Sequence, residues 1–216
     1  MPSVESAVRE VPGAVGVVAR HLGSDAEIRL RDDEVFFSAS TKKVPLLVEL
    51  YRQVDAGEID LGRRVELTDR IRAPGSGVLR EMATGLQPTI RDLAVLMIII
   101  SDNTATDYLY HLVGPGRIDE TMRRLGLTKT RIPLSSRELV YSIAGVKTDD
   151  IALGNRLANE RLSRQEIDAE SDALSEERSD VSSPADMVRL LEVVQRGEVL
   201  SQASREAVLD EKNSSS

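Results

Sequence analysis

The sequence predicts an α/β fold of the α+β type, in which a helical layer packs on an antiparallel sheet and the cleft lies between the two layers. Residues 14–19 and 27–31 are strand-like runs on either side of a Gly-Ser-Asp turn, which predicts a hairpin over residues 13–31. Residues 93–100 would be apolar on every side of a helix. This run predicts the buried centre of the helical layer, which we expect over residues 89–113.

The composition is that of a globular chain with an aliphatic core. The chain has 216 residues, of which 41% are apolar and 30% charged, with 4 Tyr, 2 Phe, no Trp and a net charge of −8. Few aromatic rings and an acidic balance argue against a nucleic-acid partner. There is no cysteine, and His21 and His111 are the only imidazoles, so thiolate chemistry is excluded and neither a metal nor a cofactor is expected.

Nothing in the sequence predicts a membrane partner. The longest apolar run, residues 93–100, is too short to span a bilayer. Residues 1–11 lack the basic segment followed by an apolar one that is typical of a signal peptide. The chain is therefore expected to be soluble and cytoplasmic.

Apolar spacing and helix-breaking residues predict three helices in the first half of the chain. Residues 4–10 form a short helix closed by Pro12-Gly13, and residues 40–56 form a longer helix that ends at Gly57. Thr89-Ile90-Arg91-Asp92 is typical of a helix start and opens the helix of the apolar run. These helices supply the core of the predicted helical layer.

The other segments are assigned from their composition and their breakers. The irregular stretch 60–85 is interpreted as a surface connection rather than as part of a site. Residues 147–183 are acidic and poor in apolar side chains, which predicts a solvated helix and loop. Further helices are predicted over residues 117–125, from Ser183-Pro184 to Gly197 with Met187, Leu190, Leu191 and Val194 inward, and over residues 201–210.

Ser40 and Lys43 stand three residues apart where an extended segment turns into a helix. Positions i and i+3 share a helix face, so the Lys43 amine can reach the Ser40 hydroxyl. A partly buried lysine beside the positive end of a helix is favoured in its neutral form and can take a proton from serine. The pair is a candidate nucleophile and base, and the alternative is that Ser40 only caps the helix.

Ser101-Asp102-Asn103 follows directly on the predicted buried helix. Polar groups delivered to the end of such a helix need partners or a solvent-filled cleft. The alternative is an ordinary helix terminus, in which Ser101 or Asn103 caps the next helix, residues 105–112.

Together, Ser40-x-x-Lys43 and Ser101-Asp102-Asn103 resemble the first two of three motifs shared by class A β-lactamases and penicillin-binding proteins. The similarity extends to Gly-Ser-Gly-Val-Leu at residues 75–79 and to Met-Ile-x-x-Ser-Asp-Asn-Thr-Ala-Thr at residues 97–106. It covers about residues 13–131, and more loosely the chain through the helix after Pro184. A β-lactamase-like fold is therefore implied.

The resemblance also implies a reaction and a set of roles. Ser40 would be the acylated nucleophile and Lys43 its proton acceptor. Ser101 would shuttle a proton to the leaving nitrogen, and the Asn103 amide would hold the substrate side chain. The favoured reaction is hydrolysis of a β-lactam amide through acyl-Ser40. The alternatives are a peptidase or esterase acting on peptidoglycan-like acyl substrates, and a catalytically impaired remnant that binds a ligand or a partner.

The sequence departs from the family pattern at two places. The deacylating glutamate of class A enzymes would fall on Ser136, so Glu138, two residues on, is kept as the candidate base, with a charged surface residue as the alternative. No Lys-Thr-Gly or Lys-Ser-Gly follows residue 183. In the family this motif lies on a strand beside the nucleophile and supplies one donor of the oxyanion hole.

The second departure predicts an incomplete sheet. Residues 1–210 are then expected to be a single truncated catalytic domain with weak activity, followed by a polar tail over residues 211–216. Because an exposed strand edge can pair with another chain, self-association through the open sheet edge is expected.

Overall fold

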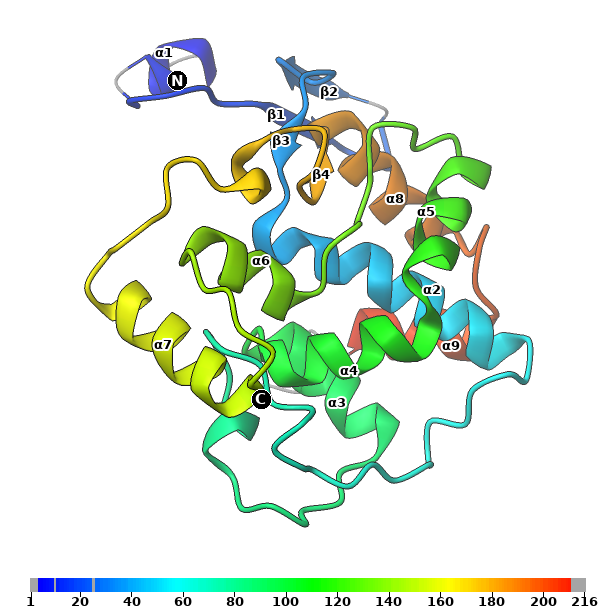
Figure 1. Cartoon of the computed structure of the whole chain (residues 1–216). Helices are drawn as coiled ribbons and strands as arrows, with labels where there is room; N and C mark the ends of the chain where they lie inside the picture. The colour runs from blue at the N-terminus through cyan, green and yellow to red at the C-terminus, as the bar shows by residue number, and fades with distance from the viewer. Residues whose placement is uncertain (1–3, 10, 25, 211–216) are drawn as a thin grey trace.

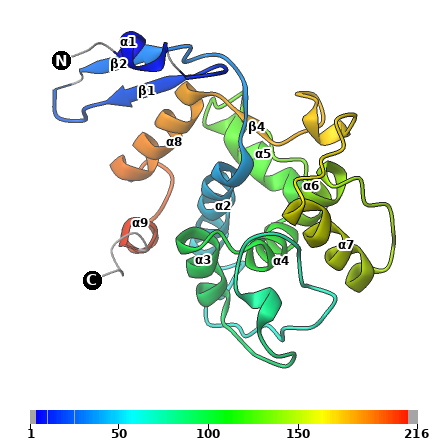
Figure 2. The same ribbon diagram turned by 90° about the vertical axis from the view of Figure 1, so that its left-hand side faces the viewer.

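Helix α2 (Lys43–Asp55) is the centre of the fold, with the other elements arranged around it (Figures 1 and 2). The computed structural model describes residues 4–9, 11–24 and 26–210. The α2 side chains are buried on nearly every side, and Leu46, Val48 and Leu50 are at most 1% exposed. A helix covered on all sides in this way holds a fixed position, and the predicted nucleophile, Ser40, lies three residues before its first residue.

The helical layer beside α2 consists of α3 (Ile90–Ile99), α4 (Asn103–Val113) and α5 (Pro115–Arg124). The predicted start of α3 is confirmed: Thr89 Oγ1 accepts a hydrogen bond from Asp92 N, and Asp92 Oδ2 accepts one from Thr89 N. The prediction that this helix is buried on every side is wrong, because Ile99 is 45% exposed. Helix α3 packs on α2 and α4 with one face and leaves the other open.

The hairpin predicted over residues 13–31 is confirmed. Strand β1 (Val17–Arg20) pairs antiparallel with β2 (Glu27–Leu30), with Val17 opposite Leu30, and Asp25 of the predicted turn lies outside the described residues. A second small sheet, of β3 (Phe36–Phe37) and β4 (Val181–Ser182), is present in addition to the strands predicted from the sequence. Each strand of this second sheet has two residues, too few to show an alternating pattern in the sequence.

The C-terminal half adds α6 (Ser136–Ile143), α7 (Ile151–Ser163), α8 (Pro184–Arg196) and α9 (Gln202–Asp210). Gly197 ends α8 in the left-handed conformation, as its sequence predicts. Leu190 and Val194 face inward as expected, whereas Leu191 is 44% exposed. It lies on the side of α8 that faces a surface cavity shared with Leu22 and Leu209.

Four shorter elements complete the described chain. They are α1 (Val4–Val8) and the 3-10 helices Ala39–Lys42, Leu79–Glu81 and Asp172–Leu174. The acidic segment predicted to be solvated is buried at its end, where residues 179–183 are at most 5% exposed. Residue 10 of the predicted first helix and the predicted tail 211–216 lie outside the described residues.

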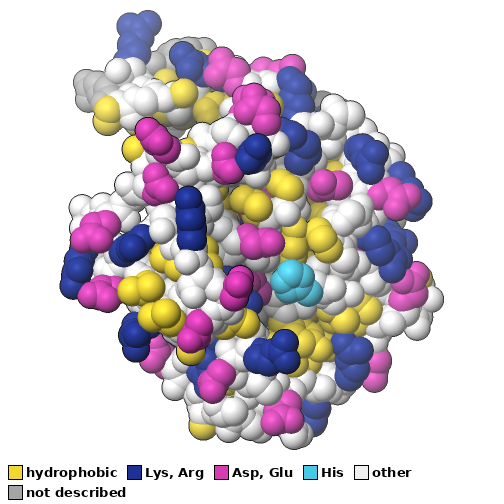
Figure 3. All heavy atoms as spheres, in the orientation of Figure 1, with side chains coloured by type: hydrophobic (Ala, Val, Ile, Leu, Met, Phe, Trp, Pro, Cys, Tyr) yellow, Lys and Arg dark blue, Asp and Glu magenta, His cyan; other side chains and the backbone are white. Residues whose placement is uncertain are grey.

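Charged side chains of both signs are interspersed over the face shown in Figure 3, with small hydrophobic areas between them. No field of one sign dominates this face. Across the described ranges, none of the helices has both the length and the apolar character needed to cross a bilayer.

Candidate active site

Ser40 lies at the point where β3 leads into the central helix. Ala39 has a φ of +43°, a left-handed conformation that residues with a Cβ rarely adopt, and it opens a 3-10 helix (Ala39–Lys42) that runs directly into α2. The cap position of this turn is Ser38, which makes no side-chain cap bond. The Ser40 hydroxyl is therefore not used as a helix cap, and it is exposed and open to a ligand.

The structure brings Ser40, Lys43 and Ser101 within hydrogen-bond reach of one another. Ser40 Oγ lies 2.8 Å from Ser101 Oγ, and Lys43 Nζ lies 2.6 Å from Ser101 Oγ and 3.4 Å from Ser40 Oγ. Ser101 stands between α3 and α4 with a φ of +58°. The two hydroxyls and the amine form one continuous path for a proton.

The surroundings of Lys43 favour its neutral amine. Its side chain is buried, and burial lowers its pKa to about 8; the neighbouring Lys42 charge also lowers it, while Asp102 and Asp107 act in the opposite direction. Lys43 Nζ donates to Ser101 O at 2.8 Å and to Asn103 Oδ1 at 3.1 Å. Both of these oxygens only accept hydrogen bonds, so a neutral amine that donates to them has its lone pair free for a hydroxyl proton.

Asp102 fixes the turn that carries Ser101. Its Oδ1 accepts a hydrogen bond from Ala105 N at 3.0 Å, which makes Asp102 the N-cap of α4 in place of Ser101 or Asn103, the predicted alternatives. Its Oδ2 accepts from Val78 N at 2.7 Å and Leu79 N at 2.9 Å. One fully buried carboxylate therefore joins the start of α4 to a distant loop.

That loop, residues 73–79, lines the cluster, so the interpretation of this stretch as a mere surface connection is wrong. Ser76 Oγ donates to Ser101 O at 2.7 Å, and Asn103 Nδ2 donates to Pro74 O at 2.8 Å. Asn103 N also donates to Ser76 O at 3.0 Å. These hydrogen bonds join residues that are far apart in the sequence, and composition alone did not reveal them.

Asn103 and Glu138 are the other two residues singled out in the sequence. Asn103 is 9% exposed and holds Lys43 through Oδ1, while its role in binding a substrate stays a prediction. Glu138 lies in the first turn of α6, where its Oε2 accepts from Ser135 N at 2.7 Å and Ser135 Oγ accepts from Glu138 N at 3.2 Å. This is a capping box, which Ser135-x-x-Glu138 signals in the sequence. The role of Glu138 as a base also stays a prediction.

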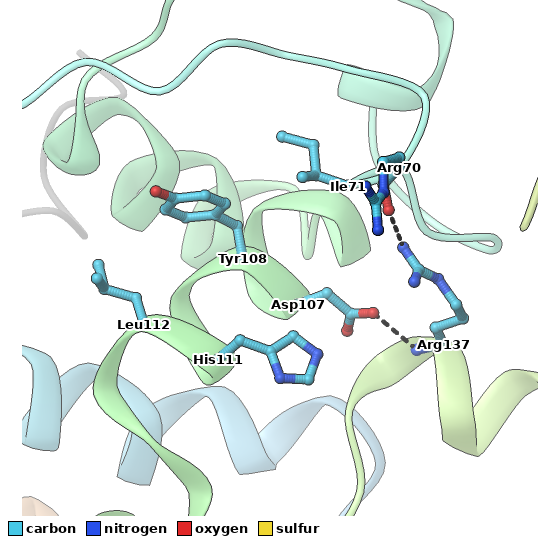
Figure 4. Close-up of a pocket in the computed structure, with 7 residues that line it drawn as sticks. All are labelled: Arg70, Ile71, Asp107, Tyr108, His111, Leu112 and Arg137. Carbon is cyan, nitrogen blue, oxygen red and sulfur yellow. Dashed lines mark hydrogen bonds between the residues drawn. The ribbon is translucent and has the colours of Figure 1, made fainter.

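A cavity of about 340 Å³ lies between α4, α6 and the chain at residues 70–71 (Figure 4). At its edge the buried Asp107 carboxylate accepts hydrogen bonds from Ser136 N and Arg137 N, which ties the start of α6 to α4; burial raises the pKa of Asp107. Arg137 Nη2 donates to Arg70 O at 2.9 Å. None of Ser40, Lys43, Ser101 or Asn103 lines this cavity, so it is separate from the cluster.

This arrangement of helices and small sheets is the β-lactamase fold. The crystal structure of a β-lactamase from Sphaerobacter thermophilus superimposes with a TM-score of 0.75 at 29% identity, over 95% of this chain and 65% of that one. The sequence profile described as "Beta-lactamase enzyme family" matches residues 2–214, and the chain belongs to that family.

Two curated relatives have different printed functions. The β-lactamase L2 of Stenotrophomonas maltophilia is 31% identical over 209 residues, which are 96% of this chain and 57% of that protein. The β-lactamase regulatory protein BlaB of Streptomyces cacaoi is 27% identical over 147 residues, which are 64% of this chain and 47% of that protein. The chain thus spans about half the length of the curated relatives it matches.

Proposed function

We propose that the chain is a serine hydrolase that opens a β-lactam amide through an acyl-Ser40 intermediate, with the residues up to 210 acting as one catalytic domain. The observation that carries this proposal is the contact of Ser40 with both Ser101 and Lys43, whose pKa is lowered to about 8. Membership of the Beta-lactamase enzyme family supports the choice of a β-lactam over other acyl substrates.

The proposed first step is proton transfer from Ser40. Neutral Lys43 accepts the proton directly or through Ser101, and Ser40 Oγ then attacks the carbonyl carbon of the lactam. The backbone N–H of Ser40 lies in the first turn of a helix, where N–H groups lack helical partners, so it is a suitable donor to the resulting oxyanion. Protonated Lys43 returns its proton through Ser101 to the ring nitrogen, and the C–N bond breaks.

We propose that the Asn103 amide contacts the substrate through the one N–H that has no partner among the contacts described above. Its Oδ1 faces Lys43 and one N–H donates to Pro74 O, and an amide nitrogen carries a second N–H. A carbonyl of the substrate side chain would accept from that second N–H.

Incubation with a fluorescent penicillin followed by intact-mass measurement tests the proposal. We expect wild-type protein to gain the mass of one penicillin, and the Ser40→Ala variant to gain none because it lacks the nucleophilic oxygen. The Ser38→Ala variant is the matched control, since Ser38 lies two residues away and makes no side-chain cap bond. An adduct on Ser40→Ala, or a wild type that forms neither an adduct nor hydrolysed penicillin, would contradict the proposal.

Deacylation by Glu138 has a separate test. If Glu138 activates the deacylating water, the Glu138→Gln adduct should persist longer than the wild-type adduct, because an amide cannot take the proton. Gln can still accept from Ser135 N, so the cap of α6 is expected to survive the change. Equal lifetimes of the two adducts would remove Glu138 as the base.

A second candidate function is binding of another protein chain, which one relative's printed name, a regulatory protein, supports. Apolar side chains are exposed on the hairpin and around it, including Leu22, Ile28 and Phe37. We propose self-association through the edge of this hairpin, since unpaired strand edges favour pairing. Light scattering should show dimers or larger species as concentration rises, and a monomer at all concentrations would reject this proposal.

A further inference from the structure

Asp180 is a buried carboxylate outside the Ser40 cluster, and it joins three segments of the chain. Its side chain is 1% exposed. Asp180 Oδ2 accepts from Lys42 Nζ at 2.7 Å, and Oδ1 accepts from Leu134 N at 3.0 Å. Lys42 Nζ also donates to Leu134 O at 2.9 Å, so both charges are hydrogen-bonded. A buried ion pair needs such further bonds to offset the cost of taking its charges out of water.

The backbone carbonyl of Asp180 binds the chain on the N-terminal side of Ser40. Asp180 O accepts from Ser38 N at 2.9 Å, which extends the pairing of β3 with β4 by one residue. Asp180 therefore holds the residue two before Ser40 with its carbonyl and the residue two after Ser40 with its carboxylate. Between them lies Ala39, whose φ of +43° is a strained conformation for a residue with a Cβ. A strained backbone persists only where its neighbours are fixed.

The same ion pair controls a charge next to the amine of the cluster. Lys42 and Lys43 are adjacent, and the Lys42 charge opposes protonation of Lys43, whereas Asp102 and Asp107 favour it. The Asp180 carboxylate forms an ion pair with the Lys42 ammonium and so partly cancels the effect of the Lys42 charge on Lys43. Removal of either partner should therefore change the protonation of Lys43, in opposite directions.

We propose that Asp180 is a positioning residue for Ser40, which it fixes through Ser38 and Lys42, and that its pair with Lys42 sets the charge beside Lys43. This inference rests on the proposed acylation of Ser40 and adds to it a residue that lies 140 positions away in the chain. Asp180 makes no contact with the reacting atoms and acts through the two residues that it holds.

The test compares Asp180→Asn with Lys42→Met by the acylation rate per folded molecule as a function of pH. Both variants should slow acylation at high pH by about 10²-fold, the effect of a nucleophile displaced by about 1 Å. In Asp180→Asn the Lys42 charge loses its counter-ion and opposes protonation of Lys43 more strongly, so the pH midpoint of the acylation rate should fall. In Lys42→Met this charge is gone, so the midpoint of the acylation rate should rise. A role in stability alone would not move the midpoints in opposite directions.

Two further variants control for folding and for charge. Asp186→Asn removes another internal carboxylate, which accepts from Lys129 N and Thr130 Oγ1, and should leave the midpoint unchanged. Lys42→Arg keeps the charge and should keep the wild-type midpoint. Midpoints of Asp180→Asn and Lys42→Met that shift together, or not at all, would overturn the proposal.

Titration of Lys43 by NMR, after ¹³C-methylation of the lysine amines, gives the same midpoints without a β-lactam. It separates the two proposals: if wild-type protein is never acylated, the proposed function fails, while the NMR midpoints still decide the effect of Asp180 on Lys43.

Discussion

Acylation of Ser40 is expected to slow by about 10³-fold when Lys43 is replaced by Met, because a positioned general base contributes roughly 10² to 10⁴-fold. Met has nearly the length of Lys and no basic nitrogen. The wild-type rate should rise with pH and level off above a midpoint of about 8, since the folded protein holds the pKa of Lys43 near that value and only the neutral amine accepts a proton. In the Met variant this inflection should disappear.

The measurement is a stopped-flow acylation rate between pH 6 and about 10, within which the lowered lysine pKa falls. Lys129→Met is the control, since Lys129 is a lysine whose amine donates to Asp33 O, away from the cluster. It should retain both the rate and the inflection. A Lys43→Met variant that keeps the wild-type profile would exclude Lys43 as the base.

Gly77→Ala is expected to be the most damaging small substitution in the loop that lines the site. A Cβ on Gly77 would overlap the Asp102 carboxylate and lie 2.7 Å from Asp102 Cα, and φ at Gly77 is +114°. Asp102 cannot yield easily, because it is fully buried and holds the cap of α4. Overpacking and backbone strain together predict a loss of about 3 kcal/mol or more in the free energy of unfolding.

Gly13→Ala is the matched control for this prediction. Gly13 has nearly the same φ, +112°, and a Cβ added to it would have no neighbouring atom within 4 Å. The substitution should cost only the backbone strain, about 1–2 kcal/mol. Urea unfolding of both variants measures the difference, and acylation should fall in Gly77→Ala alone. Equal losses of stability would show that Asp102 moves away from the new methyl group.

Sequence reasoning succeeded where the signal was local. The capping box of Thr89 and Asp92, and the ends of α2 and α8 at Gly57 and Gly197, each depend on residues within one helical turn. The pairing of Ser40 with Lys43 is also local, because three residues separate them on one helical turn. These parts of the fold and site could be predicted because the physical cause and its effect lie close together in the chain.

The failures share a different cause. Asp180 lies in an acidic, polar segment that reads as solvated, and its partner Lys42 is 138 residues away. The loop at residues 73–79 has no regular pattern of apolar side chains, and it is ordered by Asp102 and Asn103 at the start of α4. The helix after Ser135 did carry a signal, the capping box with Glu138, which was interpreted for chemistry instead. Buried polar groups are specified by their distant partners, which a local window does not contain.

The pairing of β3 with β4 has a consequence for biosynthesis. Residues 36–37 meet residues 181–182, so this contact closes a loop of well over a hundred residues. Contacts of such long range form late in folding, and a nascent chain emerges from the ribosome N-terminus first. Helices α2 to α5 are all synthesised before β4 and can pack together without it. The backbone that leads into Ser40 is fixed only when β4 has been synthesised and pairs with β3. A nascent chain should therefore form its helical core first and gain a reactive Ser40 hydroxyl afterwards.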